Sequence, residues 1–78
     1  MGITAYVLIQ TEVGKAAHVT ESVRKIKGVV SADDVTGPYD VIVHTKAESL
    51  DDLGKLVVSQ IQGVEGITRT FTCPVVNL

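Results

Sequence analysis

Residues 29–46 read VVSADDVTGPYDVIVHTK, and this stretch decides the fold. Apolar and β-branched residues on both sides of Gly37-Pro38 predict two strands, over residues 29–36 and 39–46. Proline presets φ and glycine tolerates positive φ, so the dipeptide is a turn signal. Because the connection is short, we expect the two strands to be antiparallel neighbours.

The same kind of pattern continues outward on both sides. Residues 3–10 (ITAYVLIQ) predict a first strand, and residues 14–27 carry apolar side chains at helical spacing. In the second half, Ser49 with Asp52 predicts a capped helix that ends at Gly63 and is followed by a strand over 67–75. The order β-α-β-β-α-β predicts an α+β fold, the ferredoxin-like sandwich of a four-stranded antiparallel sheet with two helices on one face. The apolar stripe of the second helix contains Leu50, Leu53, Leu56, Val57 and Ile61.

Length and composition exclude several classes of protein. A chain of 78 residues has room for one domain, which we expect to span residues 1–78. One cysteine cannot form an internal disulfide, and no Cys/His cluster is available for a metal. No apolar run approaches the ~20 residues that a membrane helix needs, and the N-terminus has no secretory signal, so we expect a cytoplasmic protein without membrane partners. A net charge of −2 with seven scattered basic residues predicts no direct binding to nucleic acid.

The chain is short and rather apolar, which favours self-association. Its mean hydropathy is +0.30, and domains below ~80 residues rarely bury a comfortable core. The first strand is apolar on both faces, with Val7 and Ile9 on one and Tyr6 and Leu8 on the other. A sheet that is apolar on both faces needs a second cover, and another copy of the chain can supply it.

The sequence shows no catalytic constellation, so we expect no enzymatic activity and no cofactor. His18 and His44 fall on separate elements, without a nucleophile elbow or a glycine-rich loop nearby. Cys73 alternates with apolar residues and is expected to be a small buried side chain. Asp33 and Asp34 are neighbours along a strand and should point to opposite faces.

Two polar features remain. Asp40 directly follows the turn, and Thr68, Thr70 and Thr72 alternate along the last strand. A carboxylate, backbone groups near a glycine and threonine hydroxyls would suit a small zwitterion. The plain alternative is that Asp40 caps the turn and the threonines are an exposed strand face.

Three segments together resemble a known family: GV at 28–29, VTGPYDV at 35–41 and GITRTFT at 66–72. Their order is similar to that in the C-terminal effector domain of the Lrp/AsnC feast/famine regulators, also called RAM, for regulation of amino acid metabolism. The resemblance covers residues 3–75. Its most specific part is the T-G-x-[YF]-D hairpin between the two helices.

The resemblance implies a ligand and an assembly. Domains of that family dimerise through their sheets and often assemble further into octameric rings, and free amino acids or related effectors bind between the dimers and shift the assembly. It therefore implies that this chain binds a small effector and itself, as a dimer and as a tetramer of dimers. Regulation of transcription would then be indirect, through assembly state or through association with full-length Lrp/AsnC regulators.

The resemblance also implies which residues bind the ligand. They lie in the hairpin and the last strand, with a looser match on the second helix near positions where the family tunes its effector response. The implied ligand-binding residues are Gly37, Tyr39, Asp40, Thr70, Thr72, Leu50 and Ile61.

The chain also departs from the family, and other functions stay open. Family regulators carry an N-terminal helix-turn-helix domain, whereas here the first strand begins at Ile3, so we expect a stand-alone effector domain. Cys73-Pro74 interrupts the usual apolar run of the last strand. The alternatives are a small dimeric α+β-barrel enzyme of the monooxygenase or isomerase type, and a subunit that only assembles; fold alone does not decide between them.

Overall fold

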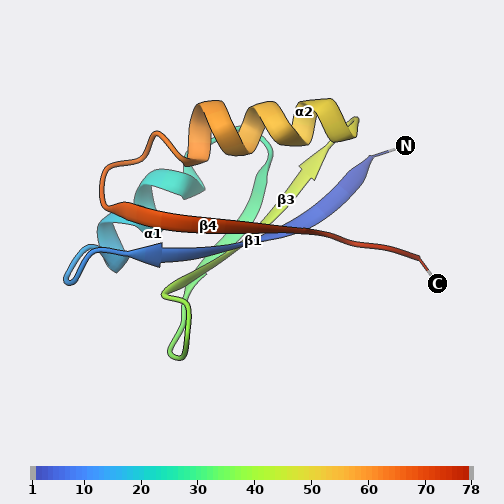
Figure 1. The fold of residues 1–78 in the computed structure, drawn as a ribbon. Coiled ribbons are helices and arrows are strands. Elements are labelled where there is room, and N and C mark those ends of the chain that lie inside the picture. Colours follow the sequence, from blue (N-terminus) through green and yellow to red (C-terminus); the bar gives the residue numbers. More distant parts are fainter. Residues whose placement is uncertain (1, 78) are drawn as a thin grey trace.

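The computed structural model describes residues 2–77 and confirms the order β-α-β-β-α-β (Figure 1). A short π-helical segment, η1, continues the second helix without a break. The elements are β1 (Ile3–Thr11), α1 (Ala16–Arg24), β2 (Val29–Asp34), β3 (Val41–Ala47), α2 (Leu50–Lys55), η1 (Leu56–Ile61) and β4 (Ile67–Pro74).

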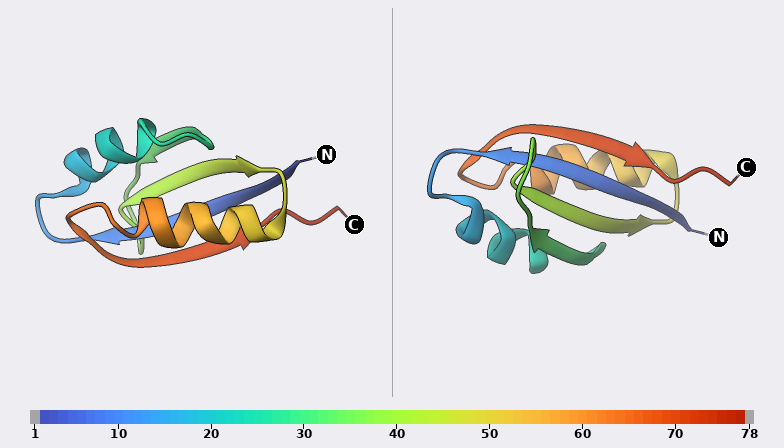
Figure 2. Two further views of the ribbon diagram at one scale, coloured as in Figure 1. Left: turned by 90° about the horizontal axis from the view of Figure 1, so that it is seen from above. Right: turned by 90° about the horizontal axis from the view of Figure 1, so that it is seen from below.

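The four strands form one antiparallel sheet in the order β2-β3-β1-β4. β1 lies at the centre, where Val7 is opposite Val43 on β3 and Thr72 on β4. Both described helices cover the same face of this sheet, as the two views of Figure 2 show. We refer to the other face, which carries Tyr6, Leu8, Ile42 and Phe71, as the open face.

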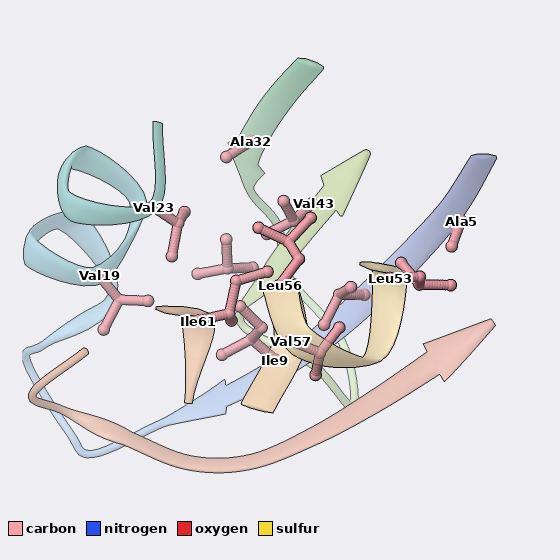
Figure 3. Packing of buried hydrophobic residues seen from close by; sticks show 12 residues of the cluster. Ala5, Ile9, Val19, Val23, Ala32, Val43, Leu53, Leu56, Val57 and Ile61 are labelled. Atoms are coloured by element: carbon pink, nitrogen blue, oxygen red, sulfur yellow. The ribbon is translucent and has the colours of Figure 1, made fainter. Parts of the chain in front are cut away.

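The core lies between the sheet and the two helices (Figure 3). Alternate residues of β1 point into it, and Val7 and Ile9 are completely buried. The helical segments contribute Val19 and Val23 from α1 and Ile61 from η1, each with no exposed surface. The full set of buried apolar residues is Ala5, Val7, Ile9, Val19, Val23, Ala32, Val41, Val43, Leu53, Leu56, Val57 and Ile61.

Several element boundaries differ from those predicted. α1 begins at Ala16 rather than Gly14, because Gly14 has φ +81° and stands outside the helix. β2 ends at Asp34 and β3 begins at Val41, so the hairpin connection is longer than the Gly37-Pro38 turn. The backbone N–H of Asp40 donates to the carbonyl of Ile9 on β1, which fixes where β3 starts.

The second helix agrees with prediction at its start and differs at its end. The Ser49 hydroxyl accepts a hydrogen bond from the Asp52 N–H at 3.1 Å, which confirms the predicted N-cap. The last turn is π-helical, and the N–H of Gln62 donates to the carbonyl of Val57, five residues earlier. Such turns are frequent at functional sites. Within residues 2–77, no helix is long and apolar enough to cross a membrane.

Candidate ligand-binding groove and self-association face

The open face is apolar along its centre. Tyr6 is 44% exposed and Phe71 is 41% exposed, and half-buried Leu8 and Ile42 lie beside them in register. Every described helix lies on the opposite side of the sheet (Figure 2), so these side chains have no cover within the described chain. Contiguous exposed apolar surface makes this face a candidate interaction site.

Aromatic contacts order this face. The rings of Tyr6 and His44 stack with their centroids 4.8 Å apart, and Tyr39 meets Phe71 edge to face at 5.7 Å. The guanidinium of Arg69 lies 5.4 Å from the centre of the Phe71 ring, a cation–π arrangement.

Cys73 belongs to the open face as well, and the prediction of a buried cysteine is wrong for the single chain. Cys73 pairs with Tyr6 across β1 and β4, and its side chain is exposed. Side chains alternate along β4 as predicted, so Cys73 and Phe71 share a face. No described helix covers that face (Figure 2). Cys73 is exposed because its side chain lies on the open face.

The hairpin of residues 35–40 is tied to the end of β1. One carboxylate oxygen of Asp40, Oδ2, accepts hydrogen bonds from the Thr11 N–H at 2.8 Å and from the Thr11 hydroxyl at 3.3 Å. The side-chain amide of Gln10 donates to the carbonyl of Pro38 at 3.0 Å. Gly37 has φ +131°, which favours glycine at the tip. Figure 1 shows the hairpin extending beyond the sheet on the side away from α2.

On the helix side, a groove of about 390 Å³ runs between the second helix and β4. We call it the α2–β4 groove. Within residues 2–77 its walls contain no charged side chain. At one end, the Gln62 side-chain amide donates to the Thr70 hydroxyl at 2.9 Å. The lining residues are Leu50, Leu53, Gly54, Val57, Val58, Gln62, Thr72 and Pro74.

The structure divides the predicted ligand-binding residues into three groups. Leu50 and Thr72 both line the α2–β4 groove, and Thr70 adjoins it through its hydrogen bond with Gln62. The hairpin residues Gly37, Tyr39 and Asp40 lie apart from the groove, at the opposite side of the sheet (Figure 1). Ile61 is completely buried in the core, so its side chain does not reach the surface.

Six residues of the groove lining were not predicted as ligand-binding residues, and three of them, Gly54, Val58 and Gln62, form one row of the second helix. They follow Leu50 at intervals of four, which is the spacing of one helix row. The four-residue spacing of that row is visible in the sequence, beside the buried stripe of the same helix. Leu50 was assigned to the buried stripe, yet it is 62% exposed and belongs to this groove row.

A larger hollow, of about 630 Å³, lies at the other edge of the sheet around β2. It mixes Lys27 and Lys46 with Glu48 and Asp52, and it contains none of the predicted ligand-binding residues. Among residues 2–77, no three His, Cys, Asp or Glu side chains come together as a metal site would require. The α2–β4 groove is therefore the better candidate for a ligand, because Leu50 and Thr72, two of the predicted ligand-binding residues, both line it.

The structure is thus a βαββαβ domain with an uncovered sheet face and an apolar groove between its second helix and β4. Residues 4–77 match the family model of the Lrp/AsnC ligand binding domain. The chain therefore belongs to the Lrp/AsnC ligand-binding domain family, whose members occur in transcription regulators.

Individual relatives agree with this assignment. The HTH-type transcriptional regulator PF0250 of Pyrococcus furiosus is 29% identical over 75 residues, covering 92% of this chain and 50% of that protein. The chain thus spans about half the length of this regulator. The crystal structure of FFRP-DM1 superposes with a TM-score of 0.89 at 31% identity, covering 95% of this chain and 99% of that chain.

A more distant structure shares the fold alone. The transcriptional regulator NMB0573 of Neisseria meningitidis, solved as a complex with L-methionine, superposes with a TM-score of 0.83 at 19% identity. The match covers 96% of this chain and 50% of that one.

Proposed function

We propose that this chain is a non-enzymatic module that binds a free amino acid or a related small effector and changes its assembly in response. It would act on transcription indirectly, through its own assembly state or through association with full-length Lrp/AsnC regulators. The 78 residues would act as a single ligand-binding domain. The near end-to-end match with FFRP-DM1 supports that domain organisation.

One observation carries the proposal. In a chain of a ligand-binding family, Leu50 and Thr72 come from elements far apart in sequence and line one uncharged groove. Pockets for small ligands are mostly apolar with a few polar groups that fix orientation. Here the Thr72 hydroxyl and the Gln62 amide are the polar groups. The methionine complex of NMB0573 supports an amino acid as the ligand, since that protein shares the fold.

Self-association would use the open face. Its exposed apolar centre can pack against the same surface of a second copy, which is the self-complementary arrangement of a two-fold dimer. The hairpin extends past this face (Figure 1). It is therefore placed to contact another chain, and we propose that the hairpin of a neighbouring dimer closes the α2–β4 groove in a tetramer of dimers.

A ligand bound between dimers would control their association. A ligand shifts an equilibrium only by its difference in affinity for the two states. A groove completed by a second dimer binds more tightly than an open groove, because more ligand surface is buried. Ligand binding and assembly would then favour each other reciprocally.

The lining of the groove supports binding rather than catalysis. Acid–base and nucleophilic chemistry need a titratable or activated side chain beside the substrate. The described lining offers apolar side chains, one glycine, one proline, one amide and one hydroxyl. The Thr72 hydroxyl belongs to a groove with no base in its described walls.

The test is a panel of the free amino acids, measured by thermal unfolding and by light scattering on the purified chain. We expect at least one amino acid at 100 times its Kd to raise Tm by about 10–20 °C and to increase the mass in solution. Val13→Asp is the control variant. Val13 is fully exposed in a loop, so this variant should respond to amino acids as the unsubstituted protein does. If no amino acid stabilises the protein and the mass is the same in all mixtures, the sensing function is refuted.

A further inference from the structure

Nothing in the described chain explains why position 54 is a glycine. It lies inside α2, where glycine is less favourable than alanine by about 1 kcal/mol. Its φ is not positive, so the backbone conformation is open to any residue. A Cβ built on Gly54 meets no heavy atom of the described chain within 4 Å. Neither conformation nor close packing therefore explains a glycine here.

The empty space beside Gly54 belongs to the α2–β4 groove. Gly54 lines the groove between Leu50 and Val58, one helical turn away on either side, with Thr72 and Pro74 opposite. The two neighbouring apolar side chains are largely exposed, at 62% and 64%. The missing side chain thus leaves an opening in an apolar wall, and glycine is the residue that lets another molecule approach a helix backbone closely.

The chemistry of the wall selects the occupant of that opening. Apolar side chains gain about 0.8 kcal/mol for each CH₂ group they bury. A charged side chain entering the same space loses hydration and finds no countercharge, since the described lining carries none. The amide nitrogen of Gln62 already donates to Thr70. Few polar groups therefore remain for a charged or strongly polar side chain.

We propose that Gly54 is a specificity-determining residue, which admits the aliphatic side chain of a free amino acid, such as leucine, isoleucine, valine or methionine, into the α2–β4 groove. This inference rests on the proposed function and adds the chemical class of the effector. Thr72 lies at the same groove and would contact the polar end of the ligand.

The experiment compares amino acids and variants by calorimetry on the purified chain. We expect the unsubstituted protein to bind at least one of leucine, isoleucine, valine and methionine 10-fold or more tightly than lysine, arginine, aspartate or glutamate. Gly54→Leu should weaken that binding at least 10-fold by filling the opening. Gly54→Ala should weaken it less. Ser59→Leu adds the same side chain at an exposed position outside the groove lining and should leave the affinity unchanged.

The outcomes separate this inference from the proposed function. Equal affinity for charged and aliphatic amino acids, or unchanged aliphatic binding by both Gly54 variants, overturns the role of Gly54 while amino-acid sensing stands. Absence of binding by every amino acid refutes both. If Gly54→Leu changes the solution mass without ligand and leaves aliphatic binding unchanged, the opening serves contact with a second copy rather than the ligand, and the inference is refuted. Gly54→Ala keeps the test valid if Gly54→Leu folds poorly, since alanine favours helix.

Discussion

The Asp40 carboxylate holds the N–H of Thr11 at 2.8 Å and thereby joins the hairpin to the end of the central strand, 29 residues earlier in the chain. The same oxygen also accepts the Thr11 hydroxyl. Asp40 thus has a structural role within one chain. The ligand contact proposed for it would be a second role, made where the hairpin meets the groove of a neighbouring dimer.

We expect Asp40→Ala to destabilise the fold by about 1.5–3 kcal/mol, because hydrogen bonds to a charged, partly buried group are lost. Urea unfolding of the monomeric or dimeric protein at fixed concentration measures this change. Asp33→Ala is the matched control, since Asp33 is exposed, and it should change stability by no more than about 0.5 kcal/mol. Equal stability of the two variants would show that the Asp40–Thr11 pair contributes nothing.

Ile42→Asp should abolish association through the open face. The substitution places a charge at the centre of an apolar surface, where burial in a dimer would be opposed by the cost of dehydrating it. Light scattering should show a monomer at concentrations where the unsubstituted protein is a dimer, with the circular dichroism spectrum retained. Val13→Asp adds the same charge in an exposed loop and should not change the mass. A dimeric Ile42→Asp protein would mean that another surface mediates association.

Two glycine-to-alanine substitutions should have opposite effects on stability. Gly54→Ala should raise the free energy of unfolding by about 0.5–1 kcal/mol, since it removes a helix-interior glycine without a clash. Gly66→Ala should lower it by more than about 1 kcal/mol. Gly66 has φ +102°, and its added Cβ would lie 3.0 Å from the Lys15 Cβ and 3.2 Å from the Val19 Cγ2. Chemical denaturation compares the two variants, and a stabilising Gly66→Ala would contradict the packing described.

Thr72→Val should weaken amino-acid binding while leaving the stability of the fold nearly unchanged. The two side chains have nearly the same shape, but valine lacks the hydroxyl that Thr72 presents in the groove. We expect Tm without ligand to change by only a few degrees and amino-acid affinity to fall about 10-fold, corresponding to one lost hydrogen bond at about 1.4 kcal/mol. Calorimetry with the amino acid that stabilises the unsubstituted protein measures this. Unchanged affinity would exclude Thr72 from the binding site.

Much of the fold follows from local patterns. Alternation along residues 3–11 assigns Val7 to the core face and Tyr6 to the other face, because successive side chains on a strand point in opposite directions. The Gly37-Pro38 turn predicts the antiparallel pairing of β2 with β3. Ser49 marks the start of α2 through its own hydroxyl. Each of these depends on residues close together in sequence.

The exact ends of the elements were less predictable. The start of β3 depends on the hydrogen bond from Asp40 to Ile9 on another strand, and the hairpin is longer than the turn signal implied. The second helix becomes π-helical after Lys55, with Gln62 donating to the Val57 carbonyl, and no local motif in the sequence predicts this change. Leu50 fits the apolar stripe by spacing, but α2 turns it toward the groove rather than the core.

The sequence by itself determined the strand and helix order, the buried face of the central strand and the apolar character of the open face, because side-chain periodicity is a local property of the backbone. Only the tertiary structure decided which distant residues meet. It joined Leu50 to Thr72 across one groove, placed the hairpin on the other side of the sheet and buried Ile61. Those relations depend on how the second helix packs along β4, and this packing is set by the shapes of many side chains together rather than by any one segment.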